Sequence, residues 1–169
     1  HNQLRDAIYQ VAASSNLAPR KEENDLLPGT NARPADVFIP NWTGGRDTAL
    51  DVTVVSPLLT DRVDNSITTP GHTLEVAFNE KCRDYLEACE REGISFIPLP
   101  VETLGGWHKK AVEQLRKLAR AQARSSGKEE DDAIRHLFQR LGVLLVKGNA
   151  ALMLNRIPSF SLPDIDGEL

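Results

Sequence analysis

The chain has 169 residues, of which 40% are hydrophobic and 26% are charged, and this composition is typical of a globular domain with one hydrophobic core. No apolar run approaches the roughly 18 residues that a membrane-spanning helix needs, and no signal-peptide pattern opens the chain, so we expect no membrane contact. The formal net charge of −4 gives nucleic-acid binding no support from overall charge.

The first residue and the two cysteines indicate what kind of protein the chain comes from and in which compartment it is found. The chain begins at His1 and its single methionine is Met153, so we expect it to be part of a longer protein. Cys82 and Cys89 lie about two turns apart in a helical pattern, which is too far for a disulfide. We therefore predict reduced thiols and an intracellular protein.

The first half of the chain predicts one helix and three strands. Residues 2–15 carry apolar side chains at helical spacing, which predicts an amphipathic helix. A short strand is predicted for residues 20–27, ahead of a Pro-Gly turn. Residues 33–40 and 48–56 have the pattern of two adjacent antiparallel strands. The segment Trp42-Thr43-Gly44-Gly45 supplies the turn between them.

The second half predicts mainly helices. Residues 57–71 are polar and predict an irregular loop. A long helix is predicted for residues 72–92, where apolar residues follow one face and Gly93 ends the pattern. Residues 94–100 predict a buried strand that extends to Thr103. Three further helices are predicted for residues 107–124, 131–146 and 150–156.

This order, α-β-β-β-α-β followed by helices, predicts an α/β fold with a mixed sheet and helices on its faces. We expect a single domain over residues 1–157, with its core in residues 1–106 and a helical extension in residues 107–157. Residues 158–169 are acidic and proline-rich, which predicts a flexible tail.

Two aspartates in the predicted adjacent strands are the most informative residues of the chain. Asp36 and Asp51 are separated by 14 residues, enough for both strands and the turn. Two carboxylates placed in this way suit a hard cation such as Mg²⁺ or Mn²⁺, with the backbone carbonyl of Val52 as a companion ligand. Such a metal suits phosphodiester hydrolysis, so we predict a nuclease core. The alternative is that both acids are structural.

Basic residues are concentrated in the predicted helix over residues 107–124, where Glu113 is the only acid. The six basic residues are Lys109, Lys110, Arg116, Lys117, Arg120 and Arg124. We predict that they bind backbone phosphates of DNA; a solvated helix face is the alternative. Trp42 and Trp107 each adjoin a Gly-Gly pair, where the indole either stacks on a base or packs in the core.

With Asp36 and Asp51 in consecutive strands, the element order resembles the PD-(D/E)xK nuclease superfamily. Within it, the chain looks most like the restriction-like endonuclease domain of non-LTR retrotransposons, also found in reverse-transcriptase polyproteins. The matching segments are Arg33-Pro34-Ala35-Asp36 and Asp51-Val52-Thr53-Val54. The resemblance covers residues 1–106 and implies a restriction-endonuclease-like core. Ala35 departs from the pattern, in which proline and aspartate are usually adjacent.

The resemblance also implies roles for individual residues. The lysine expected two residues after the second acid is replaced by Thr53, and Lys81 matches the lysine that retrotransposon domains supply from the following helix. Tyr85, one turn later on the same helix face, would orient Lys81 or contact phosphate. Glu22 matches an extra glutamate that completes the metal shell. Glu23 is the alternative, because the strand register is open.

The implied activity is that of a Mg²⁺- or Mn²⁺-dependent DNA endonuclease that nicks double-stranded target DNA, so that the freed 3′-hydroxyl primes reverse transcription. The implied partners are the target DNA and covalently linked reverse-transcriptase and DNA-binding regions, in a nuclear protein. Three alternatives stay open: a degenerate nuclease fold that only binds DNA, an assembly domain of a polyprotein, and a junction- or end-specific nuclease.

Overall fold

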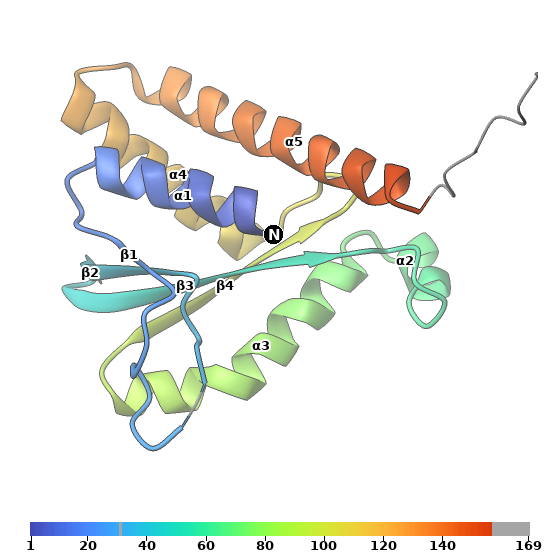
Figure 1. The fold of residues 1–169 in the computed structure, drawn as a ribbon, viewed down its shortest axis with the longest axis horizontal. Helices are drawn as coiled ribbons and strands as arrows, with labels where there is room; N and C mark the ends of the chain where they lie inside the picture. The colour runs from blue at the N-terminus through green and yellow to red at the C-terminus, as the bar shows by residue number, and fades with distance from the viewer. Residues whose placement is uncertain (31, 157–169) are drawn as a thin grey trace, which may run out of the picture.

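The computed structural model describes residues 1–30 and 32–156. In chain order its elements are α1 (Asn2–Ser14), β1 (Arg20–Lys21), β2 (Val37–Thr43), β3 (Arg46–Val55), α2 (Val63–Thr68), α3 (His72–Arg91), β4 (Ser95–Glu102), α4 (Lys109–Ser126) and α5 (Glu130–Leu154). They form a four-stranded mixed sheet with helices on both faces (Figure 1), which confirms the predicted α/β class.

The sheet has the strand order β1-β2-β3-β4. The strands β1, β2 and β3 are antiparallel neighbours, and β4 lies parallel to β3. Parallel neighbours need a crossover connection, and the segment containing α3 provides it on one face of the sheet (Figure 1). Because β3 lies between β2 and β4, Asp51 is inside the sheet, opposite Pro98 of β4. On the other side of β3, the pairing with β2 ends one residue earlier, where Leu50 lies opposite Val37.

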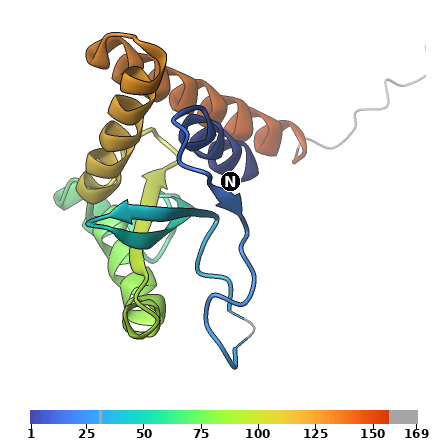
Figure 2. The same cartoon turned by 90° about the vertical axis from the view of Figure 1, so that its left-hand side faces the viewer.

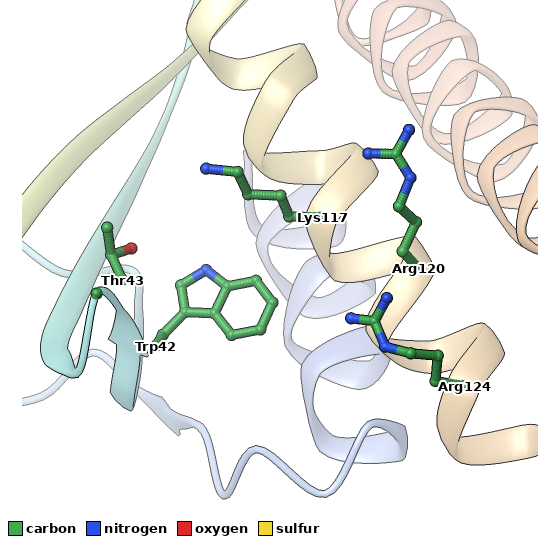
Figure 3. A pocket seen from close by; sticks show the side chains of 6 residues that line it. Trp42, Thr43, Lys117, Arg120 and Arg124 are labelled. Atoms are coloured by element: carbon green, nitrogen blue, oxygen red, sulfur yellow. The ribbon is translucent and has the colours of Figure 1, made fainter.

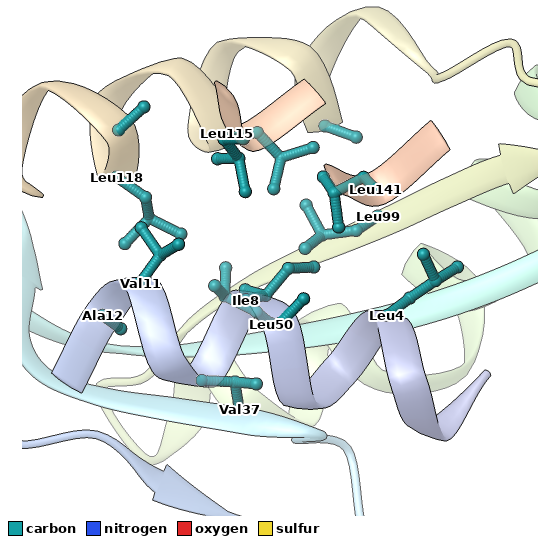
Figure 4. Packing of buried hydrophobic residues seen from close by; sticks show 14 of the residues in the cluster. Leu4, Ile8, Val11, Ala12, Val37, Leu50, Leu99, Leu115, Leu118 and Leu141 are labelled. Carbon is teal, nitrogen blue, oxygen red and sulfur yellow. The ribbon is translucent and has the colours of Figure 1, made fainter. Parts of the chain in front are cut away.

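The larger hydrophobic core lies between the sheet and the helices α1, α4 and α5, which cover one of its faces (Figures 1 and 2). In this core Leu50 of β3 packs with Ile8 of α1, Leu115 of α4 and Leu141 of α5 (Figure 4). Val52 of β3 belongs to the same core. Full burial of one such side chain contributes about 1.5–3 kcal/mol. The helices α4 and α5 therefore complete the main core.

A smaller core lies on the opposite face, under α3. It contains Phe38 of β2, Ala49 of β3 and Phe96 of β4. Side chains alternate between the two faces along a strand. Asp51 therefore projects to the same face as Ala49, toward α3, and away from Leu50 and the larger core.

Strand β2 begins later than the sequence pattern predicts. Pro34 has no N–H with which to join a hydrogen-bonded ladder, and regular pairing starts at Val37, opposite Leu50. Asp36 therefore lies immediately before the strand and not inside it, although its N–H already donates to the carbonyl of Leu50 at 3.0 Å.

The turn between β2 and β3 is also shorter than predicted. Trp42 and Thr43 belong to β2, so the turn consists of Gly44 and Gly45, whose φ angles are 59° and 78°. Positive φ at both central residues is the requirement of a type I′ turn, one of the two common two-residue hairpin turns. The register shifts between Ile39 and Thr43, where Asn41 has a φ of 53°.

The predicted strand over residues 20–27 is wrong beyond Lys21. The φ angles of Glu22 and Asp25 are 47° and 61°, in the left-handed region that β-strands do not use. The strand β1 therefore ends after two residues. The chain then forms bends and turns, and Leu27 packs in the smaller core.

Two further predictions, one of a loop and one of two separate helices, are wrong. The short helix α2 forms within residues 57–71, where an irregular loop is predicted. The predicted helices over residues 131–146 and 150–156 are a single helix, α5. Gly148 and Asn149 have weak helix propensity, but they lie inside the helix, where Asn149 donates from Nδ2 to the carbonyl of Thr103 at 2.6 Å. The predicted tail, residues 158–169, lies outside the described residues.

Within the described residues, α5 is the one helix that is long and apolar enough to cross a membrane, judged by length and composition alone. Its most apolar stretch has a mean hydropathy of 1.3, and 17% of that stretch is buried. The sequence pattern did not predict such a stretch, because it divided the helix in two. The face of α5 that carries Ala133, Leu137, Leu141 and Leu145 packs on the core.

Candidate functional site

Asp51 is the most buried acid of the site. Its side chain is 9% exposed, and its Oδ2 lies 3.0 Å from Nζ of Lys81 on α3. The same ammonium group is 3.3 Å from Oδ1, and the hydroxyl of Thr53 donates to Oδ2 at 3.1 Å. The structure thus brings together the predicted second acid, the residue at the vacant lysine position and the lysine proposed to replace it.

Burial raises the pKa of Asp51 above its ordinary value of 3.8, and the nearby carboxylate of Asp36 raises it further. The charge of Lys81 and the hydrogen bonds from Lys81 and Thr53 oppose this effect without cancelling it. A carboxylate in this environment is stabilised by additional positive charge, because burial disfavours its ionised form.

Asp36 is held in place by main-chain and side-chain contacts. Its Oδ2 accepts a hydrogen bond from the N–H of Val52 at 2.7 Å and lies 2.9 Å from Nε2 of His1, with the Asp36 side chain 14% exposed. Burial alone would lower the pKa of His1, but the hydrogen bond with Asn2 and the charge of Asp36 raise it overall. The two predicted acids therefore lie close to each other at the β2–β3 pair.

The carbonyl of Val52 is directed to the same edge of β3 as its N–H, since both groups of one strand residue point the same way. That N–H donates to Asp36, so the carbonyl lies on the side of β3 where Asp36 stands. The side chain of Val52 is in the larger core, and only its main chain is available to a ligand.

Glu22 and Glu23 occupy different surroundings. The N–H of Glu22 donates to the carbonyl of Asp36 at 3.1 Å, but its carboxylate pairs with Arg5 and is 55% exposed. Glu23 pairs with Arg20 at 2.6 Å. Glu22 is thus anchored to Asp36 by its main chain. Its left-handed φ is a costly conformation for a residue with a side chain, of the kind that is often found at functional sites.

Tyr85 lies one helical turn after Lys81 on α3. The Nζ of Lys81 is 5.6 Å from the centre of the Tyr85 ring, within the range of a cation–π interaction. The ring also meets Phe96 edge-on, with the ring centres 5.6 Å apart. These contacts let Tyr85 position Lys81 while packing against the smaller core.

The donor set fits a small hard cation. Two carboxylates and one main-chain carbonyl are oxygen ligands, and Mg²⁺ is usually bound by one or two carboxylates with several waters retained. Within the described ranges no three His, Cys, Asp or Glu side chains converge as a metal site, so the predicted third acid, Glu22, does not join Asp36 and Asp51; its carboxylate pairs with Arg5. Burial also raises the pKa of Cys89 to about 11, which disfavours the metal-binding thiolate.

The six basic residues predicted to bind DNA all lie on α4, which buries its opposite face in the larger core. Four of them pair with acids: Lys109 with Glu75, Lys110 with Glu113, and both Arg120 and Arg124 with Glu130. Arg116 and Lys117 form no ion pair with any described residue. The structure therefore does not place this basic face beside Asp51, which is on the other face of the sheet.

Sequence reasoning missed two residues that support the acids, His1 and Arg5. Arg5 follows Leu4 on α1 and contacts both Asp6 and Glu22. Its side chain is 12% exposed, unusual burial for an arginine. A charged residue next to the apolar stripe of the first helix was the available signal. No comparable signal exists for His1, whose contact with Asp36 depends on how α1 lies against the sheet.

No protein-family model, curated protein or solved structure matches this chain. A function for the chain therefore has to be argued from its own residues. These are Asp36, Asp51 and Lys81, together with the basic face of α4.

Proposed function

We propose that the chain is a Mg²⁺- or Mn²⁺-dependent DNA endonuclease domain that nicks double-stranded DNA. The observation that carries the proposal is the contact between Lys81 and the buried carboxylate of Asp51, with Asp36 beside it. Phosphodiester hydrolysis needs oxygen ligands for a cation and positive charge at the phosphate in the transition state. These three side chains supply both.

In the proposed reaction, Asp36, Asp51 and the carbonyl of Val52 would hold the cation, and Glu22 would join them only if its carboxylate left Arg5. The bound cation would neutralise phosphate charge and acidify a water molecule. Lys81 stabilises the negative charge that develops on the phosphate. Tyr85 keeps the lysine side chain in position, and Thr53 fixes the orientation of the Asp51 carboxylate.

We also propose the finer fold assignment, a restriction-endonuclease-like core. The order α1, β1, β2, β3, α3, β4 supports it, with α2 as a short addition before α3. On the resemblance of the acid motifs, the nick would prime reverse transcription in the nucleus, within a longer protein that carries a reverse transcriptase and DNA-binding regions.

Nicking of supercoiled plasmid tests the proposal. Wild-type chain is incubated with plasmid and Mg²⁺ or Mn²⁺, and Asp51→Asn, which preserves shape but removes the charge, is compared with it. We expect nicked circles from the wild type, none in EDTA, and a loss of at least about 100-fold in rate for the variant, as for removal of one electrostatic contact to a transition state.

The matched control is Asp84→Asn on α3, an exposed acid that pairs with Arg83, and it should nick at the wild-type rate. Nicking by Asp51→Asn at the wild-type rate would refute the assignment of Asp51 to a nuclease site. A folded wild-type chain that binds DNA and does not nick in either metal would do the same.

The second candidate function is a degenerate nuclease fold that only binds DNA. It predicts a folded chain that binds DNA and does not nick it in either metal. One observation favours it: Oδ2 of Asp36 already has two partners, the N–H of Val52 and His1. Removal of the contact between His1 and Asp36 should distinguish the active nuclease from the degenerate DNA-binding fold. An active site should nick faster with His1→Ala at low Mg²⁺, because Asp36 is then freed for the cation, whereas a degenerate fold stays inactive.

A further inference from the structure

A second candidate site lies on the opposite face of the sheet from Asp51. It is an open pocket of about 360 Å³ between the end of the β2–β3 hairpin and α4. Its lining residues are Trp42, Thr43, Gly44, Lys117, Arg120 and Arg124. Figure 3 shows the indole of Trp42 projecting from the hairpin toward the helix that carries the three basic side chains. We call it the Trp42 pocket.

The Trp42 pocket has excess positive charge. Arg120 and Arg124 share one carboxylate, that of Glu130, at 3.3 Å each. Lys117 has no acidic partner among residues 1–30 and 32–156. Three cations against one carboxylate leave two positive charges at the pocket. Each guanidinium has five N–H donors in a planar fork, and donors not used by Glu130 are available to phosphate oxygens.

The pocket also offers a flat aromatic surface. Trp42 packs against the larger core and is only partly buried, and no cation of the described chain lies over its ring. Beside it, the hydroxyl of Thr43 is buried and has no hydrogen-bond partner among the described residues.

An aromatic plane beside several cations matches a nucleotide, whose base stacks and whose phosphate takes the charge. We propose that the Trp42 pocket binds one unpaired nucleotide of a DNA strand, with the base on Trp42 and the phosphates on Lys117, Arg120 and Arg124. This inference rests on the proposed function in taking DNA as the substrate. It adds that the preferred substrate contains a single-stranded segment.

The position of the pocket explains why the nucleotide is unpaired. Arg46 lies opposite Thr43 at the hairpin end, and Asp51 is five residues further along β3, about 17 Å at 3.3 Å per residue. The two sites also lie on opposite faces of the sheet. A DNA segment that reaches both has to bend around the sheet within a few nucleotides. A duplex resists such bending because its persistence length is about 150 base pairs, whereas a single strand does not.

The fluorescence of Trp42 provides a direct test. The chain has two tryptophans, Trp42 and Trp107, so Trp107→Phe leaves Trp42 as the only indole. In EDTA, which prevents cleavage, this variant is titrated with an oligothymidylate of about 15 nucleotides, a length that spans one typical single-strand site. We expect saturable quenching by the oligothymidylate, and weak quenching by a blunt duplex or by an abasic oligomer with the same number of phosphates.

Affinity is then measured by anisotropy of a labelled oligothymidylate. Trp42→Leu should weaken binding roughly 5- to 150-fold, the range expected for loss of one stacked base, and Trp42→Phe should recover part of it. Lys117→Ala changes an exposed side chain and should weaken binding without affecting folding. Lys147→Ala on α5 is the matched control and should bind as the wild type does.

Absence of quenching overturns the inference, and so does equal affinity for the abasic oligomer, which would reduce the site to phosphate binding. Quenching by thymidine monophosphate at the same concentration would also overturn it, because the pocket would then select a free nucleotide. Plasmid nicking without quenching refutes this inference alone, and quenching without nicking refutes the proposed nuclease function alone.

Discussion

The Nζ of Lys81 lies 3.0 Å from Oδ2 of Asp51, and the two residues are thirty positions apart in the sequence. Thr53, the strand residue two positions after the acid, instead donates its hydroxyl to the same oxygen. The positive charge beside Asp36 and Asp51 is thus supplied by Lys81 of α3, which covers this face of the sheet, and not by a lysine of β3.

Removal of that charge gives the first prediction. Lys81→Met should lower the rate of plasmid nicking by about 10²–10³, the loss typical of one preorganised contact to a transition state. Lys81→Arg should retain part of the rate. Initial rates at saturating Mg²⁺ measure the effect. Arg83→Ala on the same helix, with a side chain 75% exposed, should nick normally. A Lys81→Met variant with an unchanged rate would assign this lysine to packing and ion pairing alone.

The second prediction concerns stability and pH. Because burial raises the pKa of Asp51 in the folded chain, the folded state holds the proton more tightly than the unfolded state. The free energy of unfolding therefore falls as the pH rises from the ordinary value of 3.8 through the raised value in the folded chain. Wherever Asp51 is ionised in the folded chain, the burial of its charge opposes folding. Asp51→Asn removes the buried charge and should therefore raise the Tm at pH values above the one at which Asp51 ionises in the folded chain.

Thermal unfolding in EDTA, followed from neutral pH downward, measures this effect. The gain in Tm should shrink as the pH falls toward the ordinary pKa, because Asp51 is then neutral in both states. Asp47→Asn, on the exposed part of β3, is the control and should give no such pH-dependent gain. A lower Tm for Asp51→Asn at neutral pH would mean that the contacts with Lys81 and Thr53 outweigh the burial of the charge.

Much of the sheet and of the acid site could be predicted from the sequence, because both follow from short-range patterns. The strand around Asp51, the helix over residues 72–92 and the presence of Lys81 on it are readable from alternation and helical spacing. Several of the predictions that failed depend on contacts between distant segments. Asn149, inside α5, bonds to the distant Thr103, and Arg5 holds the carboxylate of Glu22. The separation of the basic helix face from Asp51 likewise depends on which side of the sheet α4 occupies.

The third prediction separates the two acids by their structural roles. Oδ2 of Asp36 accepts the N–H of Val52 at 2.7 Å, and loss of the acceptor leaves that buried N–H unpaired. Asp36→Ala should therefore reduce the free energy of unfolding by about 1–3 kcal/mol. Asp36→Asn keeps an oxygen at the site and should cost less, while both variants lose nicking. Urea unfolding measures the difference, with Asp61→Ala, an exposed acid, as control. Equal stability of Asp36→Ala and the wild type would contradict the prediction.

The fourth prediction uses the unequal pairing of the basic residues on α4. Each phosphate contact from a lysine or arginine contributes about 1 to the slope of log affinity against log salt. Arg116 and Lys117 have no acidic partner among the described residues, so the double variant Arg116→Ala/Lys117→Ala should reduce the slope for a DNA duplex by about 2.

Lys109 and Lys110 are the matched comparison on the same helix. They already pair with Glu75 at 3.3 Å and with Glu113 at 3.6 Å, and a contact with phosphate has to compete with these pairs. The double variant Lys109→Ala/Lys110→Ala should therefore reduce the slope by less. Anisotropy of a labelled duplex between about 50 and 200 mM salt gives the slopes. Equal reductions in the two double variants would show that the ion pairs open without cost on binding. An unchanged slope for Arg116→Ala/Lys117→Ala would remove the exposed face of α4 from the DNA interface.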